Sequence, residues 1–338
     1  MQTATEWLRS ELFTVGPLSD ALAWVVIGLF VLAGAVEWYG RRTDADLMDT
    51  ARPIAVAAWV GFGIFWLNLF PAFAFEHQSY VEGILSLVGF PACLYVAKLL
   101  YDGRDTLFVL SRAVAVMGVI YLPFETIPAF TLGGTTFPAP RQFLIEFVTM
   151  LTGEIITLFG YSPALVESPE GYMATYQWIL EDGHRYNVSI VLACTGLGSI
   201  AIFGGLIGAV RAPLSRKLRG LAVAVPIIFV LNVFRTAFIS IVSGNQLMHW
   251  FPEVILFMFG ETNAYRVSFL LSDRVISQLL AVVALIGITY LVARQLPELL
   301  TVLEDILYVL TGEEHDLQDA LDLPREPAVE QPEARRAD

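Results

Sequence analysis

The sequence has few of the side chains with which soluble enzymes usually build metal and redox sites. Its 338 residues include only two cysteines and four histidines. The cysteines are too few for a disulfide framework or a cysteine-based zinc site, and the histidines lack metal-ligand spacing. The sequence also has no glycine-rich phosphate loop, no nucleic-acid motif and no basic stripe. We therefore expect no metal ion, no cofactor and no nucleic-acid partner.

Charge is scarce as well. Charged residues make up 16% of the chain, against about a quarter in soluble domains, and the mean hydropathy is +0.64. The only lysines are Lys98 and Lys217, and the formal net charge is −13, a balance that hints at a salt-adapted source. Much of the negative charge lies in residues 311–338. We therefore expect a transmembrane domain over 1–310 and a disordered, acidic cytoplasmic tail after it.

Long apolar runs take the place of the missing charge. A helix of about 20 apolar residues crosses the hydrocarbon core of a membrane, so repeated runs predict an all-α, polytopic integral membrane helical bundle. The runs cover 22–36, 54–75, 84–100, 107–124, 143–159, 188–210, 221–242 and 275–293. Residues 297–310 are apolar with interspersed acidic residues, which is typical of an interfacial helix.

Basic residues orient these runs. They gather between residues 41 and 52, between 98 and 112, between 211 and 219, and at Arg294. The positive-inside rule places all four connections in the cytoplasm. This is consistent only if the run 143–159, which carries Glu146 and Glu154, does not cross. We predict about seven crossings, an external N-terminus, a cytoplasmic tail, and 143–159 as an external interfacial or re-entrant helix.

Three residues of unusual chemistry fall at similar depth in three of these runs. Cys194 would lie about two turns, roughly 9 Å, from the outer end of its run. Arg235 is also about two turns from the outer end of its run, and Arg274 starts the last span. Charged side chains in a bilayer are costly and usually face the bundle interior or a wet cavity. We therefore predict that the three side chains meet near the outer face.

The faces of the predicted helices support this meeting. Small residues at four-residue spacing let helices approach closely, and such a stripe would turn Cys194 toward a neighbouring helix. The stripe comprises Cys194, Gly198, Ala201, Gly205 and Gly208. On the next predicted helix Arg235 shares a face with Asn232. On the last, Arg274 shares a face with Ser277 and Gln278.

A cysteine with two arginines suffices for thiolate chemistry. A free thiol has a pKa of about 8.5, which burial raises and a nearby guanidinium lowers. A second guanidinium can hold the oxyanion of a tetrahedral intermediate in a site of low dielectric constant. Asp273 and Glu261 are candidate proton carriers. His184 could reach the thiol as a base, although a solvated loop histidine is the commoner case.

Each of these residues also has a purely structural interpretation. A cysteine in an apolar helix is usually a core residue, and we assign that role to Cys93. Arg274, near a helix end, could extend to the lipid headgroups or pair with Asp273. Arg235 lies in the middle of an uncharged stretch, so it requires a partner or a function.

Three sequence elements together resemble the exosortase/archaeosortase family. They are ACTGLGS around Cys194, NVFRT around Arg235, and a basic residue, Arg274, near the outer end of the final span. The order Cys–Arg–Arg, rather than Cys–Arg–His, is similar to that of haloarchaeal archaeosortases, and residues 185–295 carry the resemblance. It implies a membrane cysteine peptidase that acts as a transpeptidase, with Cys194 as the nucleophile and Arg235 and Arg274 as supporting basic residues.

The resemblance also implies the partners. The substrates would be secreted surface proteins, including the S-layer glycoprotein, that end in a Pro-Gly-Phe motif, one membrane helix and a basic cluster. The enzyme would cleave near this motif and pass the new C-terminus to a membrane lipid. Two other functions stay open on the residues alone: a transporter that binds an anionic solute through intramembrane arginines, and a membrane scaffold without catalysis. The transporter would be expected to show an inverted repeat, and none is visible.

Overall fold

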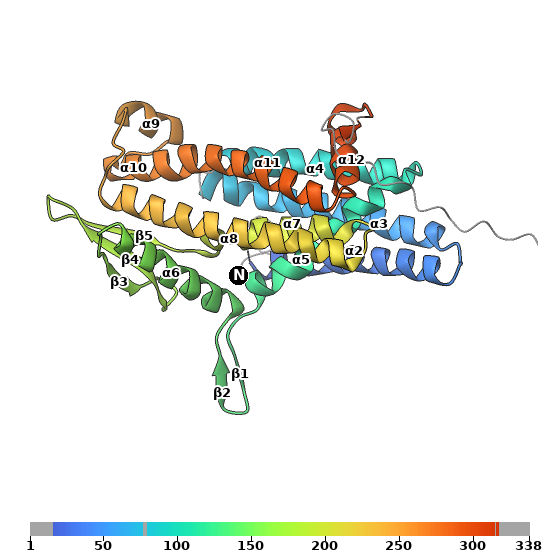
Figure 1. The fold of residues 1–338 in the computed structure, drawn as a ribbon, viewed down its shortest axis with the longest axis horizontal. Helices are drawn as coiled ribbons and strands as arrows, with labels where there is room; N and C mark the ends of the chain where they lie inside the picture. Colours follow the sequence, from blue (N-terminus) through green and yellow to red (C-terminus); the bar gives the residue numbers. More distant parts are fainter. Residues whose placement is uncertain (1–15, 77–79, 315, 318–338) are drawn as a thin grey trace, which may run out of the picture.

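Six long apolar helices dominate the architecture (Figure 1). The computed structural model describes residues 16–76, 80–314 and 316–317, and within them six helices are long and apolar enough to cross a membrane. They are α2 (Pro17–Arg42), α3 (Met48–Pro71), α4 (Tyr80–Tyr101), α5 (Phe108–Thr126), α8 (Leu214–Gly244), and a composite of η4 (Ala264–Arg266), α10 (Val267–Phe269), η5 (Leu270–Ser277) and α11 (Gln278–Gln295). The prediction of a polytopic, mostly helical membrane protein is confirmed.

Besides the short helix α9 (Pro252–Phe259), three further helices accompany the spans. α7 (Leu197–Ala209) is apolar but has 13 residues, about 20 Å at 1.5 Å per residue, so it is shorter than the hydrocarbon core. α6 (Pro140–Leu158) is not among the candidate spans, in keeping with the prediction that 143–159 does not cross. α12 (Leu299–Thr311) forms where an interfacial helix was predicted. Most of the predicted tail, like residues 1–15, lies outside the described residues.

The first four spans pack around large buried aromatic side chains. Phe30 on α2 meets Trp59 on α3 edge-on, with ring centroids 5.3 Å apart. Trp59 also donates its indole N–H to the Ser111 hydroxyl of α5 at 2.9 Å. Buried polar groups are stable when they pair in this way, so one aromatic residue joins three helices without an unpaired donor.

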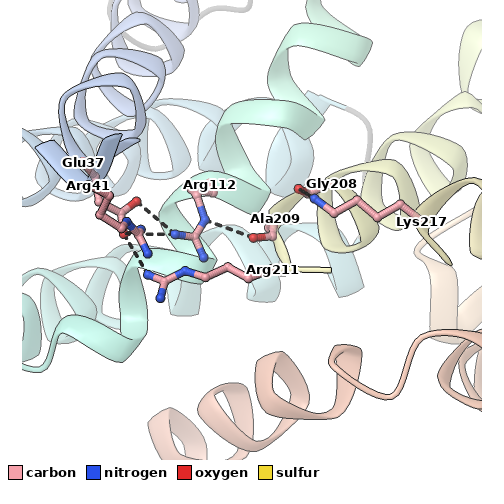
Figure 2. A network of polar contacts seen from close by, with 7 residues as sticks. All are labelled: Glu37, Arg41, Arg112, Gly208, Ala209, Arg211 and Lys217. Atoms are coloured by element: carbon pink, nitrogen blue, oxygen red, sulfur yellow. Dashed lines mark hydrogen bonds and ion pairs between the residues drawn. The ribbon is translucent and has the colours of Figure 1, made fainter. Parts of the chain in front are cut away.

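A buried carboxylate joins the basic connections, as Figure 2 shows. The Glu37 side chain on α2 is only 2% exposed, and it accepts hydrogen bonds from Arg112 of α5 at 2.9 and 3.0 Å and from Arg211 at 3.2 Å. Arg41 is a third partner. A buried carboxylate is tolerable only with such partners. Basic residues from three of the four predicted cytoplasmic connections therefore meet at one end of the bundle.

The region 188–210 is not one helix, contrary to the prediction. It begins as the end of strand β5 (Arg185–Ser189), continues through the 3₁₀ turn η3 (Leu192–Thr195), and only then enters α7. Antiparallel pairing with the preceding strand extends to Ser189, and Gly196 has a φ of +78°, a conformation that interrupts a right-handed helix. Cys194 therefore precedes a helix and does not lie two turns inside one.

Two small antiparallel sheets accompany the helices and were not predicted. β1 (Phe130–Leu132) and β2 (Thr135–Phe137) form a hairpin whose turn residues, Gly133 and Gly134, both have positive φ. β3 (Ala164–Glu167), β4 (Met173–Ile179) and β5 form the second sheet in that order. In Figure 1 this sheet lies beside α6 at one end of the molecule, and α12 lies toward the other end. The Trp178 indole of β4 donates to Ser240 of α8 at 3.3 Å, which joins the sheet to the bundle.

Candidate active site

Hydrogen bonds from α8 hold Cys194 in place. Its carbonyl oxygen accepts from the Asn232 amide at 2.5 Å and from the Thr236 hydroxyl at 3.2 Å, and its own amide donates to the Val191 carbonyl at 2.8 Å. Asn232 and Thr236 are four residues apart, so they lie on one face of α8. Arg235 and Asn232 also line one cavity, as expected for two residues on one face of α8. The hydrogen bond from Asn232 places this face against Cys194.

The residues after Cys194 explain why this motif needs its small and polar members. The Thr195 hydroxyl donates to the Leu192 carbonyl at 2.7 Å and accepts from the Leu197 amide at 3.3 Å, so it closes the turn before α7. Gly196 adopts positive φ, and a Cβ atom there would lie 3.1 Å from the Asn232 side chain. Thr195 and Gly196 therefore shape the backbone of this turn, and none of these contacts uses the Cys194 side chain.

The N-terminus of α7 follows the cysteine directly. Gly196 is the N-cap of α7, two residues after Cys194. The predicted continuous helix would have put Cys194 in mid-helix. The break at Gly196 instead leaves it in the turn that precedes α7, an arrangement that the sequence did not reveal.

The two predicted arginines converge on one carboxylate. Arg235 Nη2 lies 2.5 Å from Asp273 Oδ1, and Arg274 Nε lies 3.6 Å from Asp273 Oδ2. All three charged groups are near enough to interact electrostatically with the Cys194 thiol. The structure therefore brings Cys194, Arg235 and Arg274 together from η3, α8 and η5. It adds Asp273 as the common ionic partner of the two arginines.

A π-helical segment presents Asp273 and Arg274. The segment η5 interrupts the last span between α10 and α11. Single π-helical turns widen a helix locally and occur often at functional sites. Arg274 thus pairs with Asp273, as its structural interpretation required. This pair belongs to a cluster that also contains Arg235 and lies beside Cys194.

The other candidate proton carriers lie elsewhere. The His184 ring stacks on Tyr265 with centroids 4.2 Å apart, and β5, about 16 Å long at 3.3 Å per residue, separates it from η3. The Tyr265 hydroxyl donates to Asp182 at 2.6 Å and holds the pKa of that carboxyl below its usual value. Glu261 pairs with Arg266. These contacts dock the β4–β5 hairpin on η4 and give His184 and Glu261 structural partners.

The small-residue stripe is only partly an interface. A Cβ atom on Gly205 would lie 2.5 Å from the Ala113 carbonyl oxygen, and one on Gly208 would lie 3.1 Å from Val116. The close approach predicted for these two glycines is therefore real, and the neighbour is α5. Gly198 has no neighbour within 4 Å at its Cβ position, so its place in the packed stripe was predicted wrongly. Cys194 lies outside the helix altogether. Cys93 is buried on α4, in keeping with its structural assignment.

The sequence did not predict the roles of Thr236 and Asp273 in this site. Thr236 stands four residues after Asn232 in NVFRT, and this helical spacing could have identified it. Asp273 was considered only as a proton carrier or as a partner of Arg274, because its contact with Arg235 joins residues 38 positions apart. No local pattern records such a contact.

Comparisons with known proteins cover most of the chain. The sequence pattern of the transmembrane exosortases matches residues 7–266. Archaeosortase A of Haloferax volcanii is 58% identical over 308 residues, which are 91% of this chain and 99% of that protein. Archaeosortase A of Natronomonas pharaonis is 42% identical over 301 residues, which are 87% of this chain and 90% of that protein. No solved structure matches. The similarity spans the candidate membrane helices and is not confined to the motifs.

Proposed function

The chain belongs to the transmembrane exosortase family, and from that premise we propose that it is a cysteine transpeptidase with Cys194 as nucleophile. Membership makes it a membrane-embedded, sortase-like processing enzyme. The proposal adds the chemistry, the sorting signal and the acceptor. Arg235 and Arg274 are proposed as the groups that stabilise the thiolate and the oxyanion.

One observation carries this proposal: Cys194 and both arginines come together from three separate elements. Asn232 and Thr236 fix the cysteine against α8 by its carbonyl oxygen. One turn away on the same helix, Arg235 is fixed by Asp273 at 2.5 Å. Preorganised donors in a site of low dielectric constant are the main source of stabilisation for developing negative charge.

The first half-reaction uses the thiol's own proton. The sulfur of Cys194 attacks the scissile carbonyl carbon, and the oxyanion that forms is held by guanidinium N–H groups. The C–N bond then breaks, and the leaving amine takes the proton that the thiol has lost. The products are a thioester between the substrate and Cys194 and the released C-terminal segment. Asp273 is the nearer of the two predicted proton carriers, because it borders both arginines.

The second half-reaction restores the thiol. A hydroxyl or amine of a membrane lipid attacks the thioester carbonyl, a new C–O or C–N bond forms, and the C–S bond breaks. The proton of the attacking group returns to the sulfur. No metal ion or redox partner enters the balance, and the two half-reactions together exchange a peptide bond for a bond to lipid.

The proposed substrates are secreted surface proteins such as the S-layer glycoprotein. Each would end in a Pro-Gly-Phe motif, one membrane helix and a basic cluster. The proposed orientation is consistent with substrates outside the cell, because the arginines around Glu37 lie at the end of the bundle that the positive-inside rule assigns to the cytoplasm. Cys194 would then face the exterior, at the depth where the helix of a substrate emerges.

The experiment that tests the proposal compares the two cysteines. A Cys194→Ala strain should accumulate surface proteins that keep their C-terminal helix and carry no lipid, with processing at least about a thousandfold slower. Cys93→Ala is the matched control and should process normally, because Cys93 is a buried side chain on α4. Normal lipidated substrate in the Cys194→Ala strain would refute the proposal.

A transporter for anionic solutes is the alternative from another class. It is favoured by the fact that Arg235 lines an open cavity. Most of the cavity lining is hydrocarbon, however, which does not suit a small hydrophilic anion. This alternative requires that Cys194 be replaceable while Arg235 is not, so the same pair of strains separates the two functions.

A further inference from the structure

A groove of about 580 Å³ runs between α8 and α11, with α7 at its base. Most of its lining is hydrocarbon, including Phe203, Leu231, Phe238, Leu280, Ala284 and Ile288. α11 is the least buried of the six candidate spans, so the groove opens on a side of the bundle that faces lipid. In Figure 1 the two helices lie side by side.

Toward the Ser277 end of the groove a polar patch interrupts the apolar lining. The patch comprises Ser199, Asn232, Arg235 and Ser277, and Phe238 lies beyond it on α8. Ser277 is 3% exposed, and among the described residues its hydroxyl has no hydrogen-bond partner. The Nε of Arg235 is likewise buried without a partner in the described part of the chain. Unmet buried polar groups are costly, so this end of the groove suits a ligand that brings acceptor atoms and negative charge.

The length of the groove corresponds to one leaflet. On α11 the lining extends from Ser277 to Ile288, and on α8 it extends from Phe238 to Ile228. At 1.5 Å per residue each wall is about 16 Å long, roughly half of the 30 Å hydrocarbon core. These walls include the polar residues, so the groove matches the headgroup of a lipid together with the adjoining part of one hydrocarbon chain.

The size of the groove favours a lipid chain over a transmembrane helix. A helix about 10 Å wide with a pitch of 5.4 Å fills roughly 420 Å³ per turn, and a spanning helix has about five turns, so it is several times larger than the groove of about 580 Å³. Such a helix could lay only one face in the groove, whereas a hydrocarbon chain is narrow enough to lie within it.

The groove also leads to the candidate active site. Asn232 belongs to its polar patch and donates to the Cys194 carbonyl at 2.5 Å. We propose that the groove binds one hydrocarbon chain of an anionic membrane lipid, with the headgroup at Arg235 and Ser277, and so presents the acceptor lipid to Cys194. This rests on the proposed transpeptidase function for its purpose, but the binding itself does not.

The test uses the full chain with Cys194→Ala, reconstituted in phosphatidylcholine vesicles that contain a trace of phosphatidylglycerol with a diazirine on one acyl chain. After illumination, labelled peptides should come from the groove-lining parts of α8 and α11. Phosphatidylcholine with the same diazirine chain should label these peptides several-fold less. Even labelling of all lipid-facing helices, or equal labelling by the two headgroups, would overturn the proposal.

Two tryptophan substitutions on α11 provide a matched pair. Ala284→Trp would fill the groove, whereas Val282, which is 55% exposed, does not line it. Ala284→Trp should lower labelling at least about tenfold, because several methylenes lose their contact surface, and Val282→Trp should leave it unchanged. Equal labelling in the two variants would overturn the proposal. If Ala284→Trp fails to fold, the comparison of headgroups in the parent protein still decides.

In protein that retains Cys194, Ala284→Trp should release the C-terminal segment at the normal rate in a single turnover but transfer the substrate from the thioester to lipid about tenfold more slowly. Normal transfer would overturn the lipid site and leave the cysteine chemistry intact. Failure of the cysteine chemistry would instead appear as processing by the Cys194→Ala strain, with labelling of the groove unaffected. A last outcome concerns a substrate whose membrane helix carries a diazirine. If this helix labels the groove, the groove binds peptide, and the proposed lipid site is overturned.

Discussion

The guanidinium of Arg235 on α8 lies 2.5 Å from the carboxylate of Asp273 on η5. This ion pair ties the helix that holds the backbone of Cys194 to the segment that carries Arg274. The pair is partly buried, with 31% and 16% of the two side chains exposed, so each group depends on the other for its geometry.

Asp273→Asn should therefore impair both folding and activity. The change keeps the shape but leaves Arg235 without its anion, at an expected cost of about 1–3 kcal/mol, between the values for exposed and buried pairs. Processing should fall at least about tenfold. A double-mutant cycle with Arg235→Gln, read by thermal unfolding in detergent, should show coupling between the two positions. Additive losses would mean that the pair contributes nothing.

The two arginines should respond differently to substitution. Arg235→Ala should lose about 100- to 1,000-fold in processing rate, as for the removal of an oxyanion donor. Arg235→Lys should recover little, because lysine lacks the planar set of donors and can lose its charge on burial. Arg274→Lys should retain more activity, since this residue contacts Asp273 at the longer distance of 3.6 Å. Arg274→His tests whether the Cys–Arg–His arrangement also works here. Rates of substrate processing in each strain are the measurement, and equal recovery by both lysine variants would contradict the assigned roles.

Alanine at two glycines of α7 should have opposite effects. Gly205→Ala places a Cβ atom 2.5 Å from the Ala113 carbonyl oxygen, so it should cost about 1–3 kcal/mol through overpacking. Gly198→Ala meets nothing within 4 Å and should be neutral or slightly stabilising, because alanine favours helix. Thermal unfolding of the purified proteins compares them. Equal stability of the two variants would contradict the described packing of α7 on α5.

Single cysteines should report the orientation in the membrane. Pro169 lies in the exposed turn between β3 and β4, and Ser215 lies exposed at the start of α8. In a background lacking Cys93 and Cys194, an impermeant thiol reagent should label a cysteine at position 169 from outside and one at 215 only after the membrane is opened. Labelling of position 215 from outside would place the candidate site on the wrong face.

The sequence predicted the spans well because hydrophobic runs encode them directly. It failed over 188–210, where the apolar run conceals a change from strand to 3₁₀ turn to helix at Gly196. Hydropathy does not distinguish these conformations, and the pairing of β5 with β4 involves residues up to 14 positions apart. The sheets were missed because each strand has seven residues or fewer.

The candidate site, like the fold, was predicted only in part. Cys194, Arg235 and Arg274 stood out because each is unusual in an apolar run, and the fold brings them together. The role of Asp273 as their shared partner depends on how α8 and η5 pack, and the groove between α8 and α11 is visible only once both helices are placed. The residues with unusual chemistry could be identified from the sequence, whereas their partners could be identified only from the tertiary structure.

The most direct measurement is to intercept the proposed thioester. Hydroxylamine cleaves thioesters, so adding it to the reconstituted protein with a surface substrate should release the substrate with a C-terminal hydroxamate, which mass spectrometry detects and which marks the scissile bond. The account predicts this product for the unchanged protein and for Cys93→Ala, and none for Cys194→Ala. Hydroxamate formation without Cys194, or substrate cleavage that hydroxylamine never diverts, would contradict it.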